Sequence, residues 1–152
     1  MPYGTEAMHI MRAEKGFIMI GDETDGTVIP QDLNLNWAIS KKKADYLGKR
    51  AQERSHMASP DRWKLVGLET LDGSVLPDGA YAVADGVNAN GQRNVQGRIT
   101  STYFSPTLGK AIALARVPSG ESTVRVTSSA WAFTSHASDQ LLVCHDAKCP
   151  SA

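Results

Sequence analysis

The sequence predicts an α+β fold in which a short helical part precedes a small six-stranded antiparallel barrel or sandwich. Three observations support this prediction: a helical period near the N-terminus, a change of composition after residue 60, and six short β-rich segments separated by turn dipeptides. At 152 residues, the chain is long enough to bury a hydrophobic core without disulfides. We therefore expect two parts, at residues 1–58 and 61–152.

The first helix is predicted by side chains that recur at the spacing of one helical face, namely Ala7, Ile10, Met11 and Glu14. Thr5 suits the N-cap position, and Gly16 suits the left-handed residue that ends a helix. We expect the shared face to point toward the interior.

Two shorter elements are predicted before the composition changes. The apolar run 17–20 is consistent with a buried strand, and the acidic segment 21–26 that follows it has the composition of a turn. A second helix is expected at about residues 44–54. The polar residues 55–60 then separate the helical part from the β-rich part.

From residue 63 onward, β-branched residues, glycines and turn dipeptides dominate the sequence. Apolar segments between turns of the Asp-Gly, Asn-Gly and Ser-Pro type predict strands. The predicted strands lie at residues 63–70, 80–84, 95–103, 110–117, 123–127 and 141–144. Short strands with frequent glycine turns are typical of a small antiparallel barrel or sandwich.

The charges are balanced, with 16 basic and 16 acidic side chains, and residues 1–60 carry eight of each sign. This balance does not favour nucleic acid as a partner, because phosphates attract strongly basic surfaces. No apolar run approaches the ~20 residues of a membrane-spanning helix, and the N-terminus has no signal-peptide pattern. We therefore expect a cytoplasmic protein that binds neither nucleic acid nor membranes.

Standard catalytic signatures are absent from the sequence, which contains no Gly-x-Ser-x-Gly, His-Glu-x-x-His, Walker or Gly-x-Gly-x-x-Gly motif. Cys144, His145 and Cys149 lack the second Cys or His pair that would complete a tetrahedral metal site. The acidic residues at 22–25 do not have the spacing of a calcium loop, so we expect a solvated turn there. We expect no metal site and assign no catalytic residue.

Glu14 stands out because the helical period places its carboxylate on an apolar stripe. A buried carboxylate requires a positively charged partner or hydrogen bonds. Glu14 therefore either accepts hydrogen bonds from a ligand or a cation, or lies at the rim of the interior and reaches water. The alternative is a helix-end glutamate that meets Lys15 or another base at the surface. The basic run 41–43 is either a solvated face or an anion-binding group.

Several stretches resemble a known family. Residues 3–17 contain Met11-Arg12-Ala13-Glu14-Lys15-Gly16, which is similar to the Leu-Arg-x-Glu-x-Gly segment of the glycine-cleavage T-protein (aminomethyltransferase) superfamily. Residues 22–33, 37–39 and 45–50 closely resemble the alpha-subunit family of the heterotetrameric sarcosine oxidases, and residues 97–115 resemble the C-terminal barrel motif of T-proteins. The resemblance covers residues 3 to about 118.

The resemblance implies the C-terminal part of a tetrahydrofolate-binding domain followed by a six-stranded antiparallel β-barrel. It implies that Glu14 binds the pterin, because one carboxylate can accept hydrogen bonds from the N–H and the amino group on the pterin edge. Lys43 matches a position near the folate at which T-proteins place an arginine. A lysine there supplies a point charge and not a planar fork.

By resemblance, the parent enzyme is an oxidoreductase that oxidises sarcosine at a flavin and passes the one-carbon unit to tetrahydrofolate, which gives 5,10-methylenetetrahydrofolate. Flavin and NAD are expected only in parts upstream of Met1, as is the family's catalytic aspartate, and other sarcosine oxidase subunits are the expected partners. We therefore expect the chain to be a fragment that is inactive alone, with a divergent tail from about residue 119.

Two alternatives to this interpretation remain open. One is a non-catalytic interaction module, in which the barrel docks a partner subunit and Glu14 is structural. The other is a fragment of an aminomethyltransferase or of a dimethylglycine oxidase relative.

Overall fold

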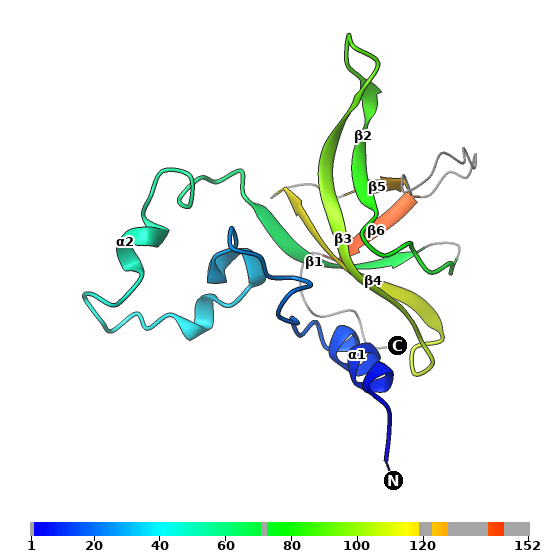
Figure 1. The fold of residues 1–152 in the computed structure, drawn as a ribbon, viewed down its shortest axis with the longest axis horizontal. Helices are drawn as coiled ribbons and strands as arrows, with labels where there is room; N and C mark the ends of the chain where they lie inside the picture. Colours follow the sequence, from blue (N-terminus) through cyan, green and yellow to red (C-terminus); the bar gives the residue numbers. More distant parts are fainter. Residues whose placement is uncertain (1, 71–72, 119–122, 128–139, 145–152) are drawn as a thin grey trace.

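The computed structural model describes residues 2–70, 73–118, 123–127 and 140–144 (Figure 1). The N-terminal part contains short helices, namely α1 (Thr5–Glu14), the 3₁₀ turns η1 (Pro30–Leu33) and η2 (Asn36–Ala38), and α2 (Lys49–Gln52). The strands follow as β1 (Trp63–Thr70), β2 (Tyr81–Val87), β3 (Arg93–Ser105), β4 (Lys110–Pro118), β5 (Thr123–Thr127) and β6 (Gln140–Cys144).

The strands form an antiparallel sheet that closes on itself in the order β1-β4-β3-β2-β5-β6. The predicted α+β class and the antiparallel sheet are therefore confirmed. The predicted bounds agree with β1 and β5, whereas β2 and β3 extend beyond the predicted residues. The tail predicted to diverge after residue 119 lies, apart from β5 and β6, outside the described residues.

The interior of the barrel holds small and branched apolar side chains. Alternate residues of β4 face inward, and they pack against partners from β1, β2 and β3; the cluster is Val66, Leu68, Leu76, Ala80, Ala82, Ile99, Ala113, Ala115 and Val117. Small barrels leave an interior just wide enough for side chains to fill. The alanines of this cluster suit that narrow space.

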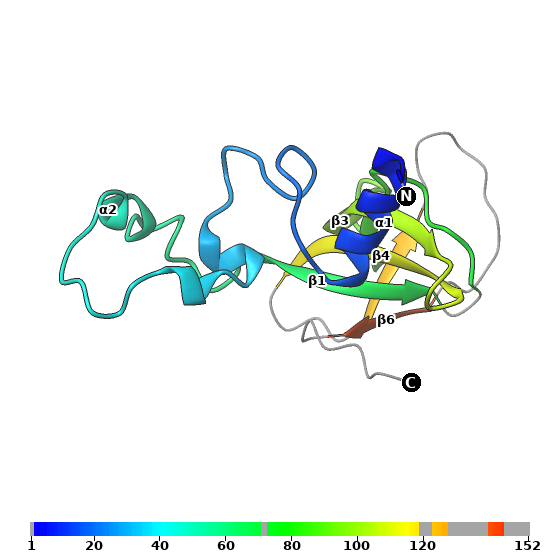
Figure 2. The same cartoon turned by 90° about the horizontal axis from the view of Figure 1, so that it is seen from below.

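The other face of β1 and β4 is also buried, because helix α1 and turn η1 lie against it (Figures 1 and 2). This second cluster consists of Ala13, Leu33, Leu65, Ile112 and Leu114. Successive residues of a strand point to opposite faces, so Leu65 belongs to the outer cluster and Val66 to the inner one. The N-terminal part and the barrel therefore share one packed layer.

Helix α1 is present as predicted, but it faces the barrel differently. The buried residue is Ala13, whereas Met11, predicted to face inward, is 47% exposed. The N-cap is Gly4 and not Thr5, and no side chain caps it. Gly16 has the predicted left-handed conformation, with φ of 69°.

Two predicted elements of the N-terminal part are wrong. The run 17–20 is not a strand: Ile20 forms only an isolated bridge with Thr24 and is 89% exposed, and the amide of Phe17 donates back to Arg12 O of α1 at 2.9 Å. The helix expected at about residues 44–54 is shortened to α2. Gly48 takes a left-handed φ of 91°, which a helix does not tolerate, so α2 begins only after it.

A buried ion pair joins η1 to the start of β1. Arg62 Nε donates to both carboxylate oxygens of Asp32, at 3.1 and 3.0 Å, and Arg62 Nη2 donates to Thr27 O at 2.6 Å. Burial raises the pKa of Asp32, but the hydrogen bonds from Arg62 outweigh it and hold that pKa below its ordinary value. The segment with η2 and α2, which extends away from the barrel in Figures 1 and 2, is thereby fixed at its base.

Replacing Asp32 by asparagine should lower the free energy of unfolding by about 3 kcal/mol, because Arg62 would lose the carboxylate of a buried pair. Since the pKa of Asp32 is lowered on folding, its stabilisation is present above the ordinary pKa of about 3.8 and is lost as the pH falls through the folded value. Urea unfolding at neutral and acid pH checks both effects. The exposed neighbour Asp61→Asn is the control, and equal stability of the two variants would contradict the prediction.

Gly97 of β3 allows β4 to approach closely. A Cβ atom at Gly97 would lie 2.6 Å from Arg116 O and 2.8 Å from Val117 Cγ1, whereas one at Gly67 of β1 would meet nothing within 4 Å. We expect Gly97→Ala to destabilise the protein by about 1–3 kcal/mol through overpacking. Gly67→Ala, the matched control, should be neutral or slightly stabilising. Thermal unfolding checks the pair, and a neutral Gly97→Ala would show that the strands can separate without cost.

Candidate functional site

Glu14 is the last residue of α1 and lies against the hairpin between β3 and β4. The hydroxyl of Ser105, which is fully buried, donates to Glu14 Oε1 at 2.5 Å. The amide of Leu108 in turn donates to Ser105 Oγ at 3.0 Å. Among the described residues, Glu14 forms no ion pair with Lys15 or with another basic side chain.

Arg12, two residues before Glu14, connects α1 to the rest of the molecule. Its guanidinium donates to Glu23 Oε2 at 2.7 Å and to Ser101 Oγ at 2.6 Å. It also pairs with Asp22 at 3.2 Å, and its side chain is only 10% exposed. The guanidinium lies 5.8 Å from the centre of the Tyr103 ring, within the range of a cation–π contact. Arg12 therefore binds both the segment after the helix and strand β3.

Glu23 corrects the expectation of a solvated acidic turn, because its side chain is 0% exposed. Besides Arg12, it accepts hydrogen bonds from the Met19 amide at 2.7 Å, Thr100 Oγ1 at 2.9 Å and Ser101 Oγ at 2.6 Å. The pairing of β3 with β4 shifts register between Ile99 and Ser101. This irregularity brings two successive hydroxyls, those of Thr100 and Ser101, to one carboxylate, as an ordinary strand does not.

The remaining carboxylates of the turn also have partners. Asp25 Oδ2 accepts from Arg116 Nη1 at 3.0 Å, and the Thr27 hydroxyl lowers the pKa of Asp25 to about 2. A polar hollow of about 410 Å³ opens beside this pair, lined by residues that include Arg98 and Asp78. The carboxylates predicted to form a solvated turn are therefore paired with arginines, namely Asp22 and Glu23 with Arg12 and Asp25 with Arg116.

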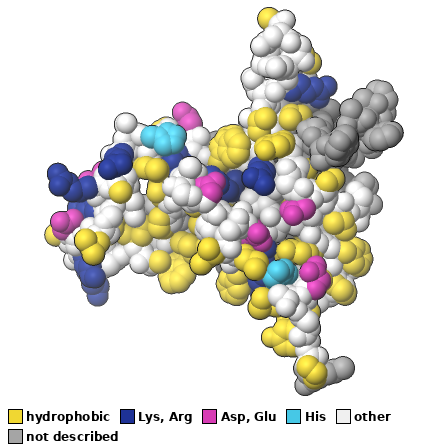
Figure 3. Space-filling model, viewed as in Figure 1, with side chains coloured by type: hydrophobic (Ala, Val, Ile, Leu, Met, Phe, Trp, Pro, Cys, Tyr) yellow, Lys and Arg dark blue, Asp and Glu magenta, His cyan; other side chains and the backbone are white. Residues whose placement is uncertain are grey.

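Lys43 lies far along the chain from this cluster and is exposed. It belongs to the segment between η2 and α2, which extends away from α1 in both ribbon views (Figures 1 and 2). On the face in Figure 3, lysine and arginine side chains gather over the part that carries α2. The structure does not bring Lys43 and Glu14 together.

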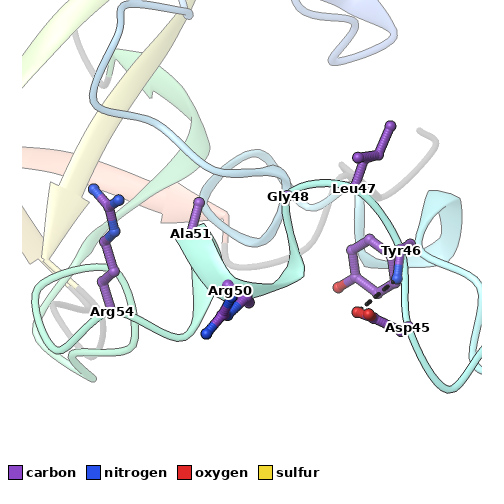
Figure 4. A pocket seen from close by; sticks show the side chains of 7 residues that line it. All are labelled: Asp45, Tyr46, Leu47, Gly48, Arg50, Ala51 and Arg54. Atoms are coloured by element: carbon purple, nitrogen blue, oxygen red, sulfur yellow. Dashed lines mark hydrogen bonds between the residues drawn. The ribbon is translucent and has the colours of Figure 1, made fainter.

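A hollow of about 560 Å³ lies within the segment that carries α2 (Figure 4). Asp45 accepts a hydrogen bond from the Tyr46 amide at 2.9 Å, while the Leu47 side chain points away from both and is fully exposed. The side chains that line this hollow do not converge on one point (Figure 4). The hollow includes neither Glu14 nor Lys43.

Within the part of the chain that the structure describes, no group of three His, Cys, Asp or Glu side chains could hold a metal ion. Of the segment Cys144 to Cys149, all but Cys144 lies outside the described residues. None of the helices in the described ranges is long and apolar enough to cross a membrane.

Sequence reasoning predicts a binding role for Glu14 but missed the residues that hold this side chain and its helix: Arg12, Glu23, Ser101 and Ser105. Ser105 enters the sequence analysis as part of a Ser-Pro turn signal and within residues 97–115, which resemble the T-protein barrel motif, but with no role of its own. The hydrogen bond between Ser105 and Glu14 spans 91 residues, and no local pattern reports such a distance. For Glu23, the one available signal in the sequence was its position as a carboxylate shortly after a helix that contains an arginine.

Comparison with known proteins adds independent evidence. The model of the glycine cleavage T-protein C-terminal barrel domain matches residues 64–132, and that of the GCVT N-terminal domain matches residues 1–43. The chain is 46% identical over 125 residues to a sarcosine oxidase subunit alpha of Corynebacterium sp. (strain P-1), with 81% of this chain covered. It is 36% identical over 120 residues to an aminomethyltransferase of Nitrosomonas europaea, with 78% of this chain covered.

The chain spans 13% of the length of that sarcosine oxidase subunit and 31% of that aminomethyltransferase. Among solved structures, the crystal structure of the glycine cleavage system aminomethyltransferase T from Bartonella henselae superposes with a TM-score of 0.67 at 25% identity. That likeness covers 90% of this chain and 36% of the other. Family models, relatives and fold agree, and the chain belongs to the glycine-cleavage T-protein family.

Proposed function

We propose that this chain supplies part of the tetrahydrofolate site, and the adjoining barrel, of a sarcosine oxidase alpha subunit. In this role it contributes to the transfer of a one-carbon unit from oxidised sarcosine to tetrahydrofolate. The family membership and the 46% identity to a sarcosine oxidase subunit alpha support the proposal. Residues 1–58 would form the folate-binding portion and residues 61–152 the barrel domain with its divergent tail from about residue 119.

The observation that carries this proposal is the geometry of Glu14. Its carboxylate is partly buried at the end of α1, and Ser105 donates to one of its oxygens. Ser105 is its one hydrogen-bond partner among the described residues, and a carboxylate offers about four lone-pair sites. The acceptors left over suit the adjacent N–H and amino groups of a pterin edge, as they would suit a guanidinium.

Tetrahydrofolate, when bound, carries the one-carbon unit between two of its nitrogens. The task of this chain is to orient it, and a reactant held in the correct geometry reacts far faster than one free in solution. We assign no residue of this chain to the chemical step. Flavin and NAD, and the binding of the other sarcosine oxidase subunits, belong in this proposal to the parent enzyme. Lys43 stays a prediction for the folate site, since the structure leaves it apart from Glu14.

The interaction-module alternative has one observation in its favour. Large apolar side chains are exposed in the N-terminal part, namely Phe17 (66%), Ile20 (89%) and Trp37 (81%). Exposed apolar groups of this size are typical of surfaces that another protein covers. Folate binding separates the two functions, because a docking module has no need of it.

Replacing Glu14 by glutamine should weaken the binding of 5-formyltetrahydrofolate at least about tenfold, because hydrogen bonds to a charged group contribute roughly 1.5–3 kcal/mol. Glutamine keeps the size of the side chain but loses the charge and one acceptor. Isothermal titration of the full chain measures the change.

Glu6→Gln is the matched control, since Glu6 lies on the exposed first turn of the same helix. Its affinity should equal that of the wild type. Wild-type affinity in the Glu14→Gln variant, or no binding by the unmodified chain, would contradict the proposed function.

A further inference from the structure

Ser105 occupies a fixed position at the end of strand β3. It is fully buried, and the turn that follows bonds to it twice: the Gly109 amide donates to Ser105 O at 2.9 Å, and the Leu108 amide donates to Ser105 Oγ at 3.0 Å. The hairpin between β3 and β4 therefore determines where the hydroxyl lies. The side chain cannot move without losing a backbone hydrogen bond.

The two hydrogen bonds at Ser105 Oγ also determine the direction of its proton. A hydroxyl carries one proton and accepts through its lone pairs. A backbone amide can only donate, so Ser105 Oγ accepts from Leu108 N and its own proton is left for Glu14 Oε1, at 2.5 Å. Glu14 thus receives a donor of fixed position and fixed direction.

The hydrogen bond from Ser105 restrains the side chain of Glu14, which the position of the helix backbone alone does not fix. Arg12 attaches α1 to Glu23 and Ser101, which sets the position of the helix backbone. A glutamate at the end of a helix nevertheless retains several side-chain torsions, and fixing them at the moment of binding has an entropic cost. Anchoring Oε1 beforehand removes much of that cost, and Oε2 has no hydrogen-bond partner among the described residues.

We propose that Ser105 is a positioning residue that orients the Glu14 carboxylate for its ligand, so that the barrel completes the site carried by the N-terminal helix. The inference rests on the proposed function, since it takes the ligand of Glu14 to be a reduced folate. Ser105 touches no ligand in this role and acts only through Glu14.

A double-mutant cycle tests the proposal with the full chain and 5-formyltetrahydrofolate as the probe. Ser105→Ala should weaken binding about tenfold, as expected for a hydrogen bond to a charged group. In the Glu14→Gln background, Ser105→Ala should have little further effect on affinity, because the Glu14 carboxylate through which Ser105 acts is already absent. Ser105→Thr, which keeps the hydroxyl, should restore most of the affinity.

Ser101→Ala is the matched control. Ser101 is a buried serine of the same strand that also donates to a carboxylate, at 2.6 Å, but to Glu23. Its effect on affinity should be the same with Glu14 intact and with Glu14→Gln, whereas the effect of Ser105→Ala should not. Thermal unfolding of each variant reports the loss of stability separately. If Ser105→Ala fails to fold, Ser105→Cys, with its weaker donor, takes its place in the cycle.

The outcomes distinguish this inference from the function beneath it. If Glu14→Gln binds folate as the wild type does, the proposed function fails. If Glu14→Gln weakens binding but Ser105→Ala does not, or if Ser105→Ala weakens it equally in both backgrounds, Ser105 has only a structural role and the inference alone is overturned.

Discussion

The placement of helix α1 on the barrel depends on one carboxylate, that of Glu23, whose side chain is completely enclosed. An enclosed charge is tolerated only where a counter-charge and hydrogen bonds surround it. Glu23 obtains these from three places in the chain: Arg12 on the helix, its own turn at Met19, and the hydroxyls of strand β3. Removing any of these partners would leave part of the charge uncompensated, so the helix, the turn and the strand are held as one unit.

The barrel contains an apolar core and also supports helix α1 on its outer face. Its interior is filled by one apolar cluster, and the outer face of β1 and β4 is covered by a second that includes Ala13 of α1. Strands buried on both faces have near-continuous apolar sequences, and residues 111–115 of β4 are all buried. The shared layer crosses the boundary predicted between residues 58 and 61, which is why a helix from one part can present Glu14 to a hairpin of the other.

Membership of the T-protein family and the arrangement around Glu14 support each other without depending on each other. The family is shown by sequence and by fold, from the barrel match to the likeness with an aminomethyltransferase T. The geometry at Glu14 consists of hydrogen bonds within this structure and does not rest on likeness to known proteins. Its parts lie 91 residues apart, so the local geometry at Glu14 requires both the N-terminal helix and the barrel to be present. Exposed apolar residues such as Ile20 and Trp37 lie outside this arrangement.

The sequence by itself determined the α+β class, helix α1 with its glycine stop, the antiparallel strands and the prominence of Glu14, because each depends on periodicity or on turn residues within a few positions. Only the tertiary structure decided that Glu23 is enclosed, that Gly48 shortens the second helix, that residues 17–20 form no strand, and that Ser105 holds Glu14. The physical reason is the same in most of these cases. A register shift in β3 and the path of the chain around the barrel bring distant polar groups together, and the cost of leaving a buried charge unpaired then selects their partners.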